Sequence, residues 1–67
     1  MTLDDCLENY EETGNTLFYT YVDQVRVMAE VKWGAGGADY KCYTNFHNED
    51  GPRLEIDDPD VDTWCEF

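Results

Sequence analysis

Three cysteines and one histidine are the residues of this chain with the side chains best suited to bind a transition metal. They are Cys6, Cys42, His47 and Cys65. Structural zinc sites usually bring their ligands in closely spaced pairs, and no such pair occurs here. Isolated cysteines are often small buried hydrophobic residues, so the sequence predicts structural thiols, no metal and no cofactor. A zinc module built on these four residues remains an alternative.

Three alternating carboxylates near the C-terminal end suggest calcium chemistry. Asp58, Asp60 and Asp62 match the first three ligand positions of an EF-hand loop. Thr63 stands where that loop requires glycine, so the motif fails. The sequence therefore predicts nonspecific cation binding and no dedicated calcium site.

The sequence contains few combinations of residues that could form a catalytic site. His47 is its only histidine, and there is no serine to act as a nucleophile. Cys42 precedes His47 by five positions, which places the two side chains on opposite faces of a strand. Carboxylate pairs need a cleft to shift their pKa values, and 67 residues leave little room for one. We therefore predict that the protein is not an enzyme.

The net charge is the most unusual property of the sequence. The chain of 67 residues has sixteen acidic and four basic residues, which gives a net charge of −12. Hydrophobic residues make up 42% and aromatic residues 15%, so we expect a folded module, with residues 1–67 as a single domain. Such a surface repels nucleic acid and anionic membranes and attracts basic partners.

The first residues contain neither a basic run nor an apolar run, so no signal peptide is predicted. The odd cysteine count is not that of a disulfide framework. No segment approaches the roughly 20 apolar residues of a membrane span. These features predict a cytoplasmic protein, in the host cytoplasm if it is encoded by a phage.

The acidic residues gather near the two ends of the sequence, while Arg26, Lys32 and Lys41 lie in its centre. B-DNA carries one charge per ~1.7 Å of its axis, and carboxylates spaced along a ridge can imitate that density. Aromatic residues between them can supply interface anchors. The candidate partner-binding residues are Asp4, Asp5, Glu8, Glu11, Glu12, Glu55, Asp57, Asp58, Asp60, Asp62 and Trp64.

A short helix is predicted over residues 2–13. Thr2 can cap it, and Gly14 is a suitable C-terminal stop. Its apolar residues follow the i, i+3, i+4, i+7 spacing of one helical stripe. These are Leu3, Cys6, Leu7 and Tyr10.

Residues 16–33 are rich in β-branched and aromatic residues and predict strand. Inward positions are expected at Val25, Val27, Ala29, Val31 and Trp33. Asp23-Gln24 is a poor two-residue turn because neither residue is glycine. The segment is therefore two strands with a tight turn or one long bent strand, and a helix over 21–32 is an alternative.

The rest of the chain predicts two further strands. The glycine-rich segment 34–38 matches no phosphate-binding motif and is expected to be a hairpin connector. Strands are predicted over 39–47 and 53–57, separated by a turn at 48–52, with Leu54 and Ile56 inward. Residues 60–67 form a helical turn or lie along the sheet. The predicted fold is α+β: a short N-terminal helix packed on a three- to four-stranded antiparallel sheet, with an acidic C-terminal segment.

One stretch near the N-terminus carries a family resemblance. It comprises Leu3-Asp4-Asp5 and Glu12-Thr13-Gly14-Asn15-Thr16-Leu17. It resembles the start of the phage uracil-DNA glycosylase inhibitors, where a short helix ends in Glu-Thr-Gly before the first strand. The second helix of that family, which helps form its hydrophobic target pocket, has no counterpart here. The resemblance implies a class of activity and assigns a role to no residue.

Small acidic α+β modules of this kind also resemble the DNA-mimic anti-restriction and anti-CRISPR proteins. The sequence thus favours a non-enzymatic inhibitor that blocks the nucleic-acid-binding site of a DNA- or RNA-acting protein, such as a nuclease, a glycosylase or a CRISPR effector. The expected partner is the basic site of that protein, with no direct binding to nucleic acid or membrane. The alternative is a small halophilic structural or regulatory protein with a generally acidic surface.

Overall fold

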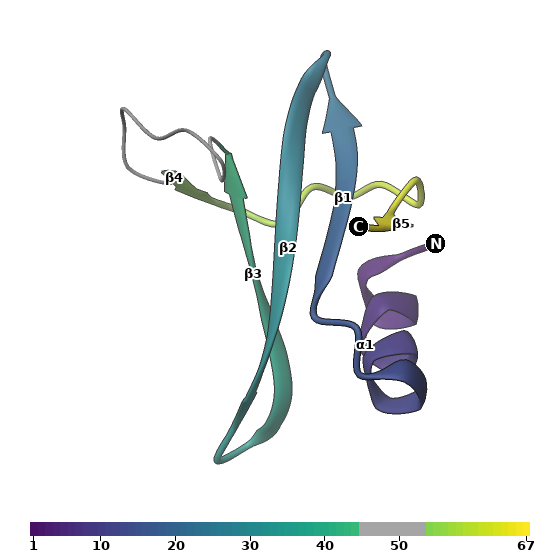
Figure 1. The fold of residues 1–67 in the computed structure, drawn as a ribbon. Helices are drawn as coiled ribbons and strands as arrows, with labels where there is room; N and C mark the ends of the chain where they lie inside the picture. The colour runs from purple at the N-terminus through teal and green to yellow at the C-terminus, as the bar shows by residue number, and fades with distance from the viewer. Residues whose placement is uncertain (45–53) are drawn as a thin grey trace.

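The computed structural model describes residues 1–44 and 54–67. In this part of the chain, one helix lies against a five-stranded antiparallel sheet (Figure 1). The elements are α1 (Leu3–Thr13), β1 (Leu17–Val22), β2 (Val25–Gly34), β3 (Gly37–Thr44), β4 (Leu54–Ile56) and β5 (Cys65–Glu66). The sheet order is β4-β3-β2-β1-β5, so a four-stranded meander gains a last strand at its β1 edge. The predicted α+β architecture is confirmed, with one strand more than expected.

Both ends of α1 are defined by the residues that the sequence indicated. The Thr2 hydroxyl accepts from the Asp5 amide at 3.2 Å, and the Asp5 carboxylate accepts from the Thr2 amide at 2.9 Å. These two bonds form a capping box. Gly14 ends the helix in the left-handed region at φ 78°, and its amide donates to the Tyr10 carbonyl at 2.8 Å. The hydrogen bonds from Thr2 lower the pKa of Asp5 below its usual value.

The segment for which strand and helix were both considered forms the β1–β2 hairpin. Val22 pairs with Val25, so Asp23 and Gln24 are the two turn residues. Both have positive φ, 50° and 68°, as a type I′ turn requires. Asp is among the residues that tolerate this region, and Asp23 takes the first position of the turn. The helix alternative and the long bent strand are therefore wrong.

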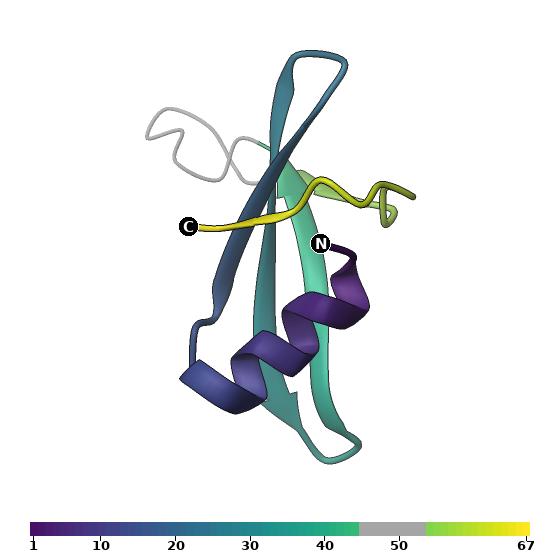
Figure 2. The same ribbon diagram turned by 90° about the vertical axis from the view of Figure 1, so that its right-hand side faces the viewer.

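The hydrophobic core lies between the sheet and a layer formed by α1 and residues 57–64. We call residues 57–64 the acidic tail. Figure 2 shows the tail crossing the same face of the sheet that α1 covers. The buried residues of this core are Leu3, Cys6, Phe18, Val27, Ala29, Val31, Cys42 and Trp64. The tail is thus part of the folded body, because Trp64 belongs to its core.

The predicted inward face of β2 is only partly correct. Val27, Ala29 and Val31 are buried as expected, whereas Val25 and Trp33 are 49% and 69% exposed. Both exposed residues lie near the ends of β2, and Trp33 lines a shallow hollow beside the end of α1.

The last described strand of the meander is less buried than the sequence suggested. Leu54 was predicted to point inward and is 51% exposed, while Ile56 is half-buried and packs against the core. Leu54 pairs with Thr44 at the end of β3, where the sheet has little cover. The predicted turn at 48–52 and the strand positions 45–47 and 53 lie outside the described residues.

Candidate functional site

The acidic tail is fixed to the sheet and to the start of the chain by hydrogen bonds. The Trp64 amide donates to the Met1 carbonyl at 3.0 Å, and the Met1 amino group donates to the Asp62 carbonyl at 2.7 Å. The hydroxyls of Thr20 and Thr63 share a hydrogen bond of 2.6 Å. Trp64 itself is only 2% exposed. Trp64 therefore anchors the tail in the core, and the acidic side chains before it are held on a rigid body.

Carboxylates from the helix and from the tail meet around Thr2. A shallow hollow is lined by Asp4 at the start of α1 and by Asp58 and Asp60 of the tail. An adjoining hollow is lined by Asp60 and Asp62, again beside Thr2. We call Asp4, Asp57, Asp58, Asp60 and Asp62 the acidic layer. Asp4 and the tail acids Asp58, Asp60 and Asp62, which are at least 54 positions away in sequence, thus lie on one surface, and Asp57 precedes them directly in the chain.

Asp58 is tied more firmly than the other members of the acidic layer. The Tyr40 hydroxyl donates to one of its oxygens at 2.9 Å, and the Cys42 thiol faces the other at 3.8 Å. Burial, followed by the hydrogen bond to Asp58, raises the pKa of Tyr40 to about 12. Burial and the negative charge of Asp58 raise the pKa of Cys42 to about 12 as well. Asp58 therefore fixes the tail to β3 in addition to carrying charge.

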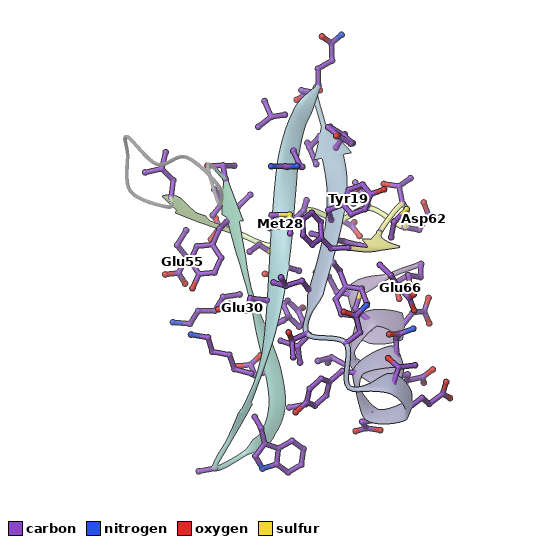
Figure 3. The ribbon with its side chains drawn as sticks, in the orientation of Figure 1. Tyr19, Met28, Glu30, Glu55, Asp62 and Glu66 are labelled. Carbon is purple, nitrogen blue, oxygen red and sulfur yellow. The ribbon has the colours of Figure 1, made fainter. Side chains whose placement is uncertain are left out.

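The other predicted site residues do not line the two hollows around Thr2. Asp5 caps α1, and Glu8, Glu11 and Glu12 are exposed further along the helix. Glu55 lies on the opposite side of the sheet, where its carboxylate is 4.0 Å from the Lys41 ammonium. Figure 3 shows Glu55 and Asp62 on the two sides of the sheet.

One acidic residue on the helix side was not among the candidates. Glu66 of β5 accepts a hydrogen bond from the Asn9 amide group of α1, which joins the edge strand to the helix. Its position follows from the pairing of β5 with β1, in which Glu66 lies opposite Phe18. No sequence pattern indicates a strand of two residues, so this carboxylate could not be placed beforehand.

The three thiols differ in their exposure. Cys6 and Cys42 are buried and Cys65 is exposed. Burial raises the pKa of Cys6 to about 11. Among residues 1–44 and 54–67, no group of three or more His, Cys, Asp and Glu side chains is placed to hold a metal ion. His47, the fourth member of the considered zinc set, lies outside the described residues.

Thiol labelling of the native protein should therefore modify Cys65 and leave the other two cysteines intact. Reaction requires an accessible thiolate, and the buried thiols of Cys6 and Cys42 are neither accessible nor ionised near neutral pH. Intact-mass spectrometry after iodoacetamide treatment should show one adduct in buffer and three in denaturant. A Cys65→Ser variant serves as the control and should give no rapid adduct. Rapid native labelling of Cys42 would contradict the structure.

The face of the sheet opposite α1 is the main feature that the sequence analysis missed. Tyr19, Met28 and Tyr43 form a row across β1, β2 and β3, as their register shows. Met28 is only 1% exposed although it lies outside the main core. The rings of Tyr21 and Phe67 contact that of Tyr19, with centroids 6.2 and 6.1 Å apart. We call this side of the sheet the open face.

The charges of the open face balance one another. Among the described residues of β2, β3 and β4, alternation along the strands places three basic and three acidic residues on it: Arg26, Lys32, Lys41, Glu30, Asp39 and Glu55. Lys32 and Glu30 are 3.4 Å apart. The excess negative charge of the described residues therefore lies elsewhere, on α1 and the acidic tail above all.

The fold and this surface define a small α+β module whose helix and tail form an acidic layer over one side of an antiparallel sheet. Comparison of the chain with protein-family models, curated proteins and solved structures finds no match. No helix in the described part of the chain is long and apolar enough to cross a membrane.

Proposed function

We propose that this protein is a non-enzymatic inhibitor that occupies the nucleic-acid-binding site of a DNA- or RNA-acting protein. The acidic layer takes the place of the phosphate backbone, and the partner supplies the lysine and arginine side chains that normally grip phosphate. The observation that carries the proposal is the meeting of Asp4 with Asp58, Asp60 and Asp62 around Thr2.

The charge density of the molecule supports this proposal. A net charge of −12 sits on a body with extents of 32, 24 and 19 Å. B-DNA carries one charge per ~1.7 Å of axis, so the two densities are of the same order. Because the carboxylates are held by a folded scaffold, they do not have to be ordered when the partner binds.

The distribution of charge favours a directed surface over general salt adaptation. Adaptation to high salt places acidic residues over the whole exterior, whereas β2, β3 and β4, as far as they are described, place as many basic as acidic residues on the open face. Most of the other described acids lie on α1 and the acidic tail. A one-sided field of this kind steers a basic partner toward one surface.

Competition for a captured partner tests the proposal. The immobilised protein should retain a nucleic-acid-binding protein from a cell lysate, and mass spectrometry identifies it. The free inhibitor should then displace a labelled DNA or RNA oligonucleotide from that purified partner. Displacement should weaken steeply as salt rises toward about 0.5 M, because the contacts are between exposed charges. A captured partner that keeps its oligonucleotide while bound to this protein would contradict the proposal.

A further inference from the structure

Trp33 is the most exposed of the large hydrophobic side chains in residues 1–44 and 54–67, at 69%. Alternation along β2 places it on the same side of the sheet as the buried Val31, which is the side that α1 and the acidic tail cover. Within the described residues its indole has neither a hydrogen-bond partner nor a ring partner. Trp33 therefore presents a large aromatic ring to solvent on the acidic side of the molecule.

The segment after Trp33 leaves the indole accessible. Residues 34–38 are Gly-Ala-Gly-Gly-Ala, and they form the turn between β2 and β3 together with the start of β3. None of them has a side chain larger than a methyl group, and a Cβ added at Gly36 would meet nothing within 4 Å. The wall of a pocket on another protein can therefore approach the ring closely from this end of the sheet.

Shallow hollows connect Trp33 with the acidic layer. Trp33 and Tyr40 line one hollow, and Tyr40 also lines the hollow beside Thr2 where helix and tail carboxylates meet. On its other side, Trp33 lines a hollow with Tyr10 and Glu11 near the end of α1. The exposed ring thus has carboxylates on both sides of it along one continuous surface.

Two lysines also line the hollow that Trp33 shares with β3, and both have carboxylate neighbours. The Lys32 ammonium is 3.4 Å from the Glu30 carboxylate, and that of Lys41 is 4.0 Å from the Glu55 carboxylate. Alternation assigns both lysines to the open face, whereas the indole lies on the other side. Their positive charge is therefore matched by acidic residues of the open face.

We propose that Trp33 takes the place of a base of single-stranded nucleic acid in the partner's binding site, while the acidic layer takes the place of the phosphates. This inference rests on the proposed function and narrows the partner to proteins that bind single strands. Such proteins combine a basic groove for the backbone with aromatic side chains on which bases stack. An indole has a flat π-face that stacks on the same rings. The bases of a duplex are already stacked inside it, so a duplex-binding site offers no such platform.

Competition for a labelled single strand tests the role of the indole. The probe is a fluorescein-labelled oligothymidylate of about 20 nucleotides, or the oligouridylate for an RNA-binding partner, bound to the captured partner. Trp33→Ala should raise the concentration for half-displacement at least about tenfold, because loss of one stacked ring typically has an effect of this size. Trp33→Phe keeps a flat ring and should stay within about threefold of the wild type. A smaller loss in Trp33→Ala, or an equal loss in Trp33→Phe, overturns the proposal.

Tyr21→Ala is the matched control, since it removes an aromatic ring that is 60% exposed at the far end of β1. Circular dichroism confirms that each variant is folded before displacement is measured. The control should displace the probe within about twofold of the wild type, because Tyr21 lines none of the hollows that connect Trp33 with the acidic layer. Equal losses in Tyr21→Ala and Trp33→Ala would overturn the special position of Trp33.

The dependence on salt separates stacking from an indirect effect on the carboxylates. An indole carries no charge, so Trp33→Ala and the wild type should lose displacement with the same slope as salt rises. A flatter slope for Trp33→Ala would mean that the substitution disturbs the acidic layer, and it would contradict a stacking role.

The partner's own preference tests this inference separately from the proposed function. The captured partner should bind the oligonucleotide at least about tenfold more tightly than an abasic strand of the same length, and more tightly than the corresponding duplex. Equal binding to the abasic strand, or preference for the duplex, overturns this inference, while displacement by the wild type keeps the proposed function. A wild-type protein that displaces nothing overturns both.

Discussion

Replacing Trp64 by Ala should remove most of the stability of this fold. Trp64 is 2% exposed and is among the largest fully buried side chains of the described residues. Truncation of a buried tryptophan typically costs about 3–5 kcal/mol. A domain of this size has a free energy of unfolding of about 3–10 kcal/mol, so Trp64→Ala should leave the chain largely unfolded or only marginally stable. The cost is high because the substitution also releases the tail that covers the core.

Trp33→Ala is the matched control, since it makes the same chemical change at a residue that is 69% exposed. Substitutions at such surface positions usually change stability by about 0.5 kcal/mol or less. Urea denaturation followed by far-ultraviolet circular dichroism compares the two variants without depending on tryptophan fluorescence. Equal midpoints for Trp64→Ala and the wild type would show that the tail is not anchored in the core.

Local sequence signals were sufficient to predict the helix and to favour strand in the centre of the chain, where one long bent strand and a helix over 21–32 stayed open as alternatives. Thr2 and Gly14 have strong positional preferences at helix ends, and those preferences act through neighbouring backbone groups. The alternation of Val27, Ala29 and Val31 likewise follows from the geometry of a strand. Each of these predictions depends on residues a few positions apart, and the structure confirms them.

Features that depend on tertiary contacts were not predicted. β5 has two residues, and it forms because Trp64 is buried and Phe18 offers a partner at the edge of β1. Met28 alternates with the polar residues of β2, yet it is 1% exposed, in register with Tyr19 and Tyr43 on the neighbouring strands. The exposure of Trp33 depends on how far the covering layer extends. Such burial is decided by residues distant in sequence, which one strand's pattern does not reveal.

The same distinction between local sequence signals and tertiary contacts applies to the acidic surface. Charge clustering in the sequence singled out Asp4, Asp58, Asp60 and Asp62, and the fold brings them together. Clustering also grouped Glu55 with them, although alternation with Leu54 and Ile56 assigns it to the other side of the sheet. Clustering of charge in the sequence indicates which residues contribute to a negative surface. The alternation of side chains along a strand indicates which face of the sheet carries them.

Neutralising part of the acidic layer should abolish most of the proposed displacement of nucleic acid. The variant D4N/D57N/D60N/D62N removes four exposed carboxylates and keeps their size. It retains Asp58, to which Tyr40 donates, and Asp5, which caps α1. Loss of each exposed charge pair weakens binding about two- to sixfold, so with four pairs lost the concentration for half-displacement should rise roughly 16- to 1,300-fold.

The matched control is D23N/E30Q/D39N/E55Q, which removes four acidic residues from the hairpin turn and the open face. Both variants have the same net charge, so any difference between them reports where the charge lies. The control should displace the oligonucleotide within about threefold of the wild type, since none of its substituted positions belongs to the acidic layer. Equal losses in the two variants would mean that total charge, and not the surface shared by helix and tail, determines inhibition. A large loss confined to the first variant would assign the phosphate-like surface to the carboxylates around Thr2.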